Sequence, residues 1–302
     1  MRLTRMAAIP ALLAAAATLA AACSSPSKST SPGTKPRITI GAQNFTENEV
    51  LAYVYSDALE AAGYPSSVKP NLGSREIIEP ALEKGDIDAT IEYVGNYLAY
   101  LDPKAGNLSV SATVATLKPI VAKKGLTLGA VSRAADSDAI AVTQATATRY
   151  HLSSIADLKP YASRWTFGGP PECATRITCV PGLEKYYGIK FKSFKSLDED
   201  GVITHTALAN GDVQAARIFS SDAVIAQDHF VVLSDPKYFQ GAGNIIPVVR
   251  TAKATPGALA VLARVSDALT TADLVQFNLK VSVDHDDPTA VASAFVQAEH
   301  LG

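Results

Sequence analysis

Three cysteines, Cys23, Cys173 and Cys179, are the side chains of this chain best suited to covalent or metal chemistry. Cys173 and Cys179 stand six positions apart in a stretch rich in glycine and proline. In an oxidising compartment such a pair indicates a disulfide that closes a small loop. The alternative is a metal site, but no third or fourth cysteine or histidine follows at a zinc-like spacing. We therefore expect a Cys173–Cys179 disulfide, no metal ion and no cofactor.

The histidines give no sign of catalysis. All five are scattered along the sequence, at His151, His205, His229, His285 and His300. The metalloprotease pattern H-E-x-x-H, the nucleophile pattern G-x-S-x-G and a phosphate-binding glycine loop are missing from the sequence. An enzyme is therefore not expected. A hydrolase would require a serine, a histidine and an acid to converge in a cleft.

The first 22 residues are typical of an export signal. Arg2 and Arg5 precede an apolar run from Met6 to Ala22, which ends in small residues directly before Cys23. A cysteine after the cleavage site resembles the lipobox of bacterial lipoproteins, in which the thiol carries a lipid, although alanine here replaces the usual leucine. The alternatives are an ordinary cleaved signal and a membrane anchor, for which the run falls short of ~20 strongly apolar residues. We predict that Cys23 is a lipid anchor on the extracytoplasmic face of the cell membrane.

Residues 23–36 are predicted to form a flexible tether, because the sequence SSPSKSTSPGTKP after the cysteine shows no apolar periodicity. The folded part begins near Arg37 and has about 265 residues, enough for one large domain or two lobes. Removing Arg2 and Arg5 with the signal leaves 25 basic residues against 29 acidic ones, a net charge of −4. This mildly acidic body argues against nucleic acid as a partner.

Strands and helices are predicted to alternate along the folded part. Residues 37–40 form a short strand, and Thr46 with Glu49 makes a capping box that starts a helix, for which Gly63 provides the C-terminal cap. Further buried strands are predicted at 139–143, 165–168, 213–219, 230–233 and 245–249, with helical stretches between most of them. This order favours an α/β architecture with mostly parallel sheet.

One segment of the chain is echoed 126 residues later. Residues 81–89 (ALEKGDIDA) resemble residues 207–215 (ALANGDVQA), and each copy predicts a helix end, a Gly-Asp turn and a strand. The same offset places Tyr93 on Phe219, so each strand ends in an aromatic residue. Chance reuse of a common motif is the alternative to two related lobes. Ligands of open α/β sheets bind at the carboxyl ends of strands, so two facing lobes would form a cleft that closes by hinge motion.

Four motifs resemble those of a known family. They are G-A-Q-N-F-T-E at residues 41–47, N-L-G-S-R at 71–75, G-D-I-D followed by E-Y-V-G at 85–95, and P-G-L-E-K-Y-Y-G at 181–188. In order and spacing they are similar to the substrate-binding proteins of osmoprotectant ABC importers, which take up glycine betaine, choline and carnitine. The resemblance covers essentially the whole chain after the signal.

This resemblance implies a two-lobed periplasmic-binding fold of type II. Lobe I would comprise residues 37–137 plus 243–302, and lobe II residues 138–242. The lobes would close around one solute, and a monomeric receptor would then deliver it to an ABC permease with its ATPase. A different solute (a polyol, a phenolic or an amino-acid-like compound) is the alternative, as is a ligand sensor that is not coupled to transport.

The resemblance also implies an aromatic cage. A quaternary ammonium donates no hydrogen bond and is held by the negative faces of aromatic rings. Tyr93 matches one tyrosine of the family's cage, and Phe219 occupies a second cage position. Asp138 stands at a third, and no aromatic residue stands at the fourth, near Gly243. Asp136 and Asp138 are therefore expected to bind a cation by charge or to accept hydrogen bonds from a polar solute.

Polar contacts complete the implied site. Arg176 matches the family's arginine for a ligand carboxylate, which a guanidinium can bind through both oxygens. Gln43 replaces a family lysine. Arg75 replaces a threonine beside the cleft and would either bind the ligand or be solvated, and for Arg176 the alternative is a surface arginine on a loop. The remaining candidates, for which turn or helix-cap roles are the alternative, are Asn44, Asn96, Ser220 and Ser221.

Overall fold

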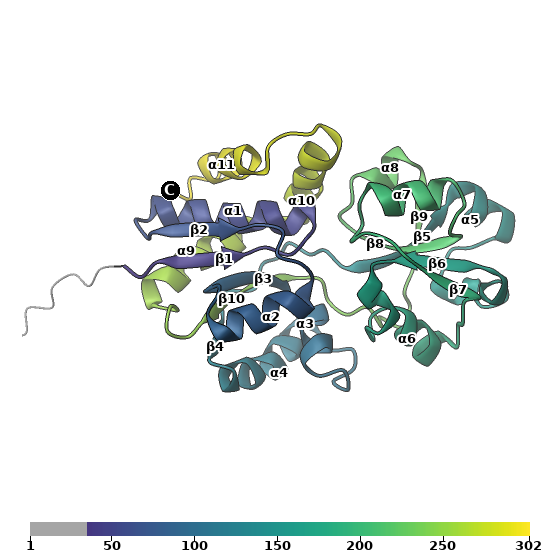
Figure 1. Cartoon of the computed structure of the whole chain (residues 1–302), viewed down its shortest axis with the longest axis horizontal. Coiled ribbons are helices and arrows are strands. Elements are labelled where there is room, and N and C mark those ends of the chain that lie inside the picture. Colours follow the sequence, from purple (N-terminus) through teal and green to yellow (C-terminus); the bar gives the residue numbers. More distant parts are fainter. Residues whose placement is uncertain (1–34) are drawn as a thin grey trace, which may run out of the picture. The chain divides into compact units, whose positions relative to one another are not determined.

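The strands formed by residues 35–302 make two five-stranded sheets. The computed structural model describes residues 35–302, which make up one compact unit. The predicted signal, the lipid anchor Cys23 and nearly all of the predicted tether lie outside the described residues. Strand order is β2-β1-β3-β10-β4 in the first sheet and β7-β6-β8-β5-β9 in the second. We call the first sheet with its helices lobe I and the second lobe II (Figure 1).

Lobe I contains the beginning and the end of the described chain. Its strands are β1 (Ile38–Gly41), β2 (Ser66–Lys69), β3 (Ala89–Tyr93), β4 (Leu126–Leu128) and β10 (Ile245–Arg250). Its helices are α1 (Thr46–Ala61), α2 (Arg75–Lys84), α3 (Val94–Leu101), α4 (Val110–Lys123), α9 (Pro256–Ala268), α10 (Thr271–Asn278) and α11 (Pro288–Ala298). Figure 1 shows α1 and α11 on one side of the sheet and α2, α3 and α4 on the other. Successive side chains of a strand point to opposite faces of the sheet. Ile245 and Val249 of β10 therefore pack into the core that contains α1 and α11, and Ile246 and Val248 pack into the core that contains α2, α3 and α4.

Lobe II is built from the middle of the chain. Its strands are β5 (Asp138–Thr143), β6 (Thr166–Gly169), β7 (Ser193–Ser196), β8 (Ala215–Phe219) and β9 (Phe230–Leu233). Its helices are α5 (Gln144–Tyr150), α6 (Val180–Gly182), α7 (Val202–Ala209) and α8 (Val224–Gln227). Helix α7 packs on one face of this sheet, and the segment from α5 to residue 191 packs on the other. The strands predicted near 139–143, 165–168, 213–219, 230–233 and 245–249 are confirmed within two residues.

The prediction of mostly parallel sheets is confirmed for four of the five strands in each sheet, and one strand of each runs in the opposite direction. Strands β1, β2 and β3 are parallel, as are β6, β7 and β8, but β10 and β5 run antiparallel to both of their neighbours. The chain enters β5 from lobe I and β10 from lobe II. Each of these strands begins beside the end of a central strand, since Asp138 pairs with Phe219 and Ile245 with Tyr93. A strand that starts where its neighbour ends must run in the opposite direction.

The predicted capping box at the start of α1 does not form. Helix α1 does begin at Thr46, but its N-cap is the extended residue Phe45, and no side chain caps the helix. The Thr46 hydroxyl instead accepts a hydrogen bond from Ser282 at 3.1 Å. At the other end Gly63, with a φ of +79°, follows the C-cap residue as predicted.

The internal echo is present in three dimensions. Strands β3 and β8 begin and end 126 residues apart, and each is the central strand of its sheet. Gly85 and Gly211, in the preceding turns, both have positive φ values. The two strands therefore place Tyr93 and Phe219 at equivalent positions of the two lobes. None of the helices formed by residues 35–302 has the length and apolar character needed to cross a membrane.

Candidate ligand-binding site

Aromatic residues from both lobes meet where the two central strands end. The ring centroids of Phe45 from lobe I and Phe219 from lobe II are 4.7 Å apart. The ring of Tyr93 lies 6.0 Å from Phe45, on the side of lobe I. The sequence predicted that Tyr93 and Phe219 face each other across a cleft. In the structure both rings are instead neighbours of Phe45, the residue directly before α1. Its position within the N-F-T-E motif was the available signal.

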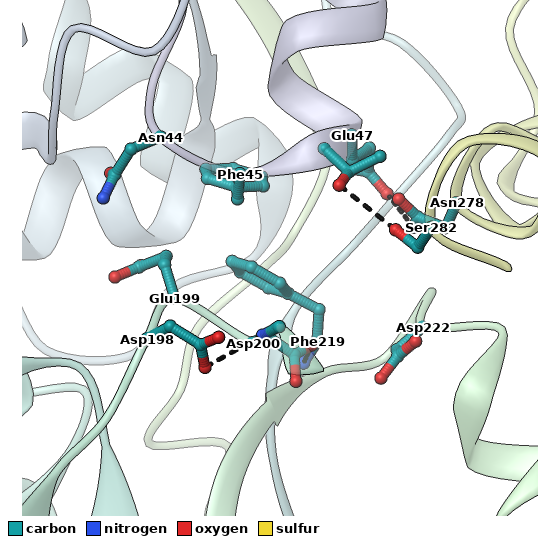
Figure 2. A pocket seen from close by; sticks show the side chains of 12 residues that line it. Asn44, Phe45, Glu47, Asp198, Glu199, Asp200, Phe219, Asp222, Asn278 and Ser282 are labelled. Carbon is teal, nitrogen blue, oxygen red and sulfur yellow. Dashed lines mark hydrogen bonds between the residues drawn. The ribbon is translucent and has the colours of Figure 1, made fainter. Parts of the chain in front are cut away.

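A pocket of about 140 Å³ lies beside the Phe45–Phe219 pair. Figure 2 shows carboxylates approaching it from both lobes, with Glu47 above and Asp198, Glu199, Asp200 and Asp222 below. The lining residues are Asn44, Phe45, Thr46, Glu47, Asp198, Glu199, Asp200, Gly201, Phe219, Asp222, Asn278 and Ser282. Lysine and arginine do not occur among them. We call this the acidic pocket.

The loop before α7 supplies three of the five carboxylates. Burial of Asp198 acts to raise its pKa. The net effect is nevertheless a lowered pKa, because the Thr204 hydroxyl and the backbone N–H groups of Gly201, Ile203 and Thr204 donate hydrogen bonds to the carboxylate. Burial raises the pKa of Glu199 against the opposing charges of Arg217 and Arg176. It also raises the pKa of Asp200, to about 6. The pocket therefore combines a firmly ionised carboxylate with two that release their protons less readily.

Glu47 connects the two lobes. Its Oε1 accepts a hydrogen bond from the hydroxyl of Tyr93 at 2.7 Å, and its Oε2 accepts one from the hydroxyl of Ser221 at 2.6 Å. The side-chain amide of Asn278 donates to the same Oε2 at 3.2 Å. Tyr93 thus orients Glu47 with its hydroxyl and does not itself line the acidic pocket. Glu47 was not among the predicted site residues, because it was interpreted as part of a helix start.

A second buried carboxylate, Asp136, holds the same serine. Asp136 Oδ1 accepts hydrogen bonds from the backbone N–H of Ser221 at 2.9 Å and from the hydroxyl of Ser220 at 3.1 Å. Burial raises the pKa of both Asp136 and Glu47, and the charge of Glu47 raises the pKa of Asp136 further. The predicted residues Asp136, Ser220 and Ser221 therefore form a network behind the pocket.

The free energy of unfolding should decrease with rising pH because of the carboxyl groups of Glu47 and Asp136. Their folded pKa values lie above the ordinary values of 4.5 and 3.8, so the native state keeps protons that the unfolded chain has released. Stability from this source is fully present below the ordinary values and is lost as pH rises through the folded ones. We expect Glu47→Gln, which cannot ionise, to flatten this dependence in urea unfolding from pH 5 to 8. The exposed variant Glu60→Gln is the control, and equal slopes for wild type and Glu47→Gln would contradict the assignment.

Asp138 has a partner that the sequence analysis missed. Arg217 donates from Nε to Asp138 Oδ1 at 2.8 Å and also through Nη2, and both side chains are buried. The guanidinium carbon of Arg217 lies 3.8 Å from the centroid of the Phe219 ring. The predicted role of Asp138 in binding a cation directly is therefore not supported, because Arg217 neutralises it. Arg217 lies two residues before Phe219 on a strand and therefore on the same face, a signal that the sequence contained.

The missing fourth cage position has a steric reason. Near Gly243 the two segments that pass between the lobes are hydrogen-bonded, from Asp136 N–H to the Gly243 carbonyl at 2.9 Å. A Cβ at position 243 would lie 2.0 Å from the carbonyl oxygen of Asp136. A side chain does not fit here without moving the crossing segments.

Arg176 lies in a different cavity, of about 350 Å³, which also contains Arg75 and Asn96. Its guanidinium donates to both carboxylate oxygens of Glu76 at 3.0 and 2.8 Å, and this contact joins lobe II to lobe I. Glu199, which lines the acidic pocket, is 3.6 Å away on the other side. The Cys173–Cys179 disulfide that encloses Arg176 in its loop is confirmed.

Arg75 and Gln43 have roles inside lobe I. Arg75 is buried and donates through Nε and Nη2 to the buried carboxylate of Glu92, at 2.7–3.0 Å. Gln43 is also buried, and its backbone N–H donates to Asn48 Oδ1 at 2.8 Å. The predicted site residues are thus divided between the acidic pocket (Asn44, Phe219), the Arg176 cavity (Arg75, Asn96, Arg176), buried positions beside them (Gln43, Tyr93, Asp136, Asp138, Ser221) and one exposed position (Ser220).

Two α/β lobes with a small polar pocket between them define a solute-binding protein of the periplasmic-binding type. The chain belongs to the family described as the substrate binding domain of the ABC-type glycine betaine transport system, whose model matches residues 36–298.

Relatives of similar length share about a quarter of their residues with this chain. A glycine-betaine-binding protein of Pseudomonas aeruginosa is 25% identical over 275 residues, 87% of this chain and 88% of that protein. The glycine betaine-binding protein YehZ of Escherichia coli is 26% identical over 299 residues, 95% of this chain and 96% of YehZ. The carnitine transport binding protein OpuCC of Listeria monocytogenes is 26% identical over 275 residues, 87% of each chain.

Solved structures share the fold. A glycine betaine/carnitine/choline ABC transporter structure superposes with a TM-score of 0.69 at 22% identity, covering 87% of this chain and 99% of that one. Apo YehZ from Escherichia coli superposes with a TM-score of 0.62 at 26% identity, covering 88% and 99%. These likenesses confirm the two-lobed α/β fold expected from the sequence.

Proposed function

We propose that this chain is the receptor of an ABC importer and binds a small organic cation of the quaternary-amine type in the acidic pocket. One observation carries the proposal, namely that five carboxylates and two aromatic rings line this pocket together. A quaternary ammonium cannot donate a hydrogen bond, but an aromatic ring that it contacts attracts it by ~0.5–2 kcal/mol. The ionised carboxylates, Asp198 foremost, supply the opposite charge, and the names of the relatives agree with this class of solute.

Within this class, we propose that a cation without a carboxylate binds more tightly than a zwitterion. The lining of the acidic pocket offers no guanidinium or ammonium group to a ligand carboxylate. Arg176, the predicted carboxylate ligand, already binds both oxygens of Glu76. Betaine or carnitine would therefore have to displace Glu76, whereas choline would not.

Closure of the lobes is proposed as the response to the solute. The proposed boundaries are those predicted from the sequence, with lobe I at 37–137 plus 243–302 and lobe II at 138–242. The bonds from Ser221 to Glu47 and from Arg176 to Glu76 support closure, because each joins side chains of opposite lobes. The crossing segments near Asp136 and Gly243 would act as the hinge.

The wider arrangement is proposed from the sequence and from the family. Cys23 would carry a lipid, residues 23–36 would act as a tether, and the monomeric body would work at the extracytoplasmic face of the cell membrane. Its partner would be a permease with an ATPase, and the protein would catalyse no reaction. This arrangement keeps the receptor near its transporter and leaves it free to rotate.

A thermal-shift series tests the proposed function. A solute that binds only the folded protein, at a concentration 100 times its Kd, adds about 2.7 kcal/mol of stability. We expect choline to raise the melting temperature by about 5 °C or more, because each kcal/mol is worth roughly 2–4 °C in a chain of this size. Glycine betaine, carnitine, polyols and phenols form the comparison panel. An unchanged melting temperature throughout the panel would remove the support for the osmoprotectant class.

A further inference from the structure

Three side chains of lobe II converge on one point beside the acidic pocket. Nε2 of His205, on α7, lies 3.1 Å from Oδ1 of Asp200 and 2.8 Å from Oδ2 of Asp222. The three potential ligand atoms all lie within 4.8 Å of one another. Asp200 comes from the loop before α7 and Asp222 from the turn after β8, so three separate segments contribute to the cluster.

Each carboxylate of the cluster is fixed by its other oxygen. Oδ2 of Asp200 accepts a hydrogen bond from the backbone N–H of Phe219 at 2.5 Å. Oδ1 of Asp222 accepts one from the backbone N–H of Val224 at 2.9 Å. One oxygen of each group is thereby held by the backbone, and the other is directed at the imidazole. Such secondary contacts are the usual means by which proteins orient metal ligands.

Hydrogen bonding within the protein does not satisfy this arrangement. Nε2 of a histidine carries at most one hydrogen, so it cannot donate fully to two carboxylate oxygens. It donates to Asp200, so within residues 35–302 the buried Oδ2 of Asp222 accepts no well-aligned hydrogen bond, although it lies 2.8 Å from the same Nε2. The Asp222 side chain is only 8% exposed, so water has little access to that oxygen. Two carboxylate oxygens thus share one imidazole hydrogen, and a divalent cation in its place would bind the nitrogen and both oxygens.

We propose that His205, Asp200 and Asp222 bind one divalent transition-metal ion, with Zn²⁺ as the best match. Zinc bonds to nitrogen and oxygen are about 2.0–2.2 Å long, which puts neighbouring ligand atoms of a tetrahedral site roughly 3.4 Å apart. The observed separations of 3.1 and 2.8 Å between Nε2 and the two carboxylate oxygens would have to widen by about 0.3 and 0.6 Å to reach this value. The imidazole favours zinc over Mg²⁺ and Ca²⁺, which prefer oxygen ligands alone.

The ion would lie in the wall of the pocket and compensate the charge of two of its five carboxylates, which leaves Glu47, Asp198 and Glu199 to the proposed solute. Asp200 and Asp222 both line the acidic pocket, and Asp200 also holds the backbone of Phe219. A metal ion bound to them would tie α7, the loop before it and the end of β8 together. The site needs no solute for its formation, so its test is independent of the proposed function.

Calorimetry tests the site directly. Chelator-treated protein is titrated with ZnCl2 at neutral pH, alongside Asp222→Asn, His205→Gln and the exposed-histidine control His300→Gln. We expect one ion per chain and a loss of affinity of roughly tenfold or more in the first two variants only. Absence of zinc binding would overturn the proposal, and so would binding that Asp222→Asn and His205→Gln leave unchanged or that His300→Gln weakens equally.

X-ray absorption at the zinc edge of the wild-type protein decides the case even where a variant fails to fold. We expect nitrogen and oxygen ligands at about 2.0–2.2 Å with scattering from a single imidazole. Sulfur ligands, or more than one imidazole, would place the ion elsewhere and overturn the proposal.

Discussion

Arg75→Met is expected to lower the free energy of unfolding by about 3–5 kcal/mol, because it leaves the carboxylate of Glu92 buried without its partner. Arg75 and Glu92 are 4% and 0% exposed, and the guanidinium binds both carboxylate oxygens. Water cannot replace these bonds without entering the core. Urea unfolding of both proteins measures the difference.

Two further variants separate burial from charge in this prediction. In Arg75→Met combined with Glu92→Leu no charge remains to be buried, so we expect most of the lost stability to return. Arg250 pairs with Asp88 at 3.4 Å but is 31% exposed, and Arg250→Met should therefore cost less than about 1 kcal/mol. A cost of Arg75→Met no larger than that of Arg250→Met would contradict this expectation.

Phe219→Leu is expected to weaken binding of a quaternary ammonium solute by about 2- to 30-fold. Leucine keeps most of the apolar volume but has no ring face, so the variant removes the cation–π attraction of ~0.5–2 kcal/mol and the flat contact surface. Titration calorimetry with choline gives the change in affinity. Tyr238→Ala, which removes an aromatic ring that is 74% exposed and outside the acidic pocket, is the matched control.

The loss of affinity in Phe219→Leu has to be separated from a loss of stability. Phe219 is 8% exposed, so the truncation also costs stability, and binding must be measured below the melting temperature of the variant. Phe45→Leu provides the same test from the other lobe, since its ring lies 4.7 Å from Phe219. Unchanged affinity in both leucine variants would mean that the solute does not contact these rings.

Much of the fold could be predicted from the sequence, because its signals are local. The apolar strands, the Gly-Asp turns and the echo at an offset of 126 lie within short segments, and the structure confirms them. The Cys173–Cys179 disulfide could be predicted for the same reason, because the two cysteines are only six residues apart. The direction of β5 and β10 could not be predicted, since it depends on where the chain crosses between the sheets.

The site was predicted only in part, for physical reasons that individual residues show. Tyr93 and Phe219 were found by their repeat, but the role of Glu47 depends on Ser221, 174 positions away. Arg75 was interpreted as a contact to the ligand, although its partner Glu92 lies inside lobe I. The run Asp198-Glu199-Asp200 has the composition of an exposed turn, and only the approach of the other lobe makes it part of a pocket.

The central claim is that the acidic pocket selects a solute for its positive charge. The direct test is calorimetric titration with choline and with 3,3-dimethylbutan-1-ol, which has the same shape but carries a carbon in place of the charged nitrogen. The account predicts one choline per chain and an affinity for the neutral analogue that is at least roughly tenfold lower. Equal affinities, or no binding of choline, would contradict it.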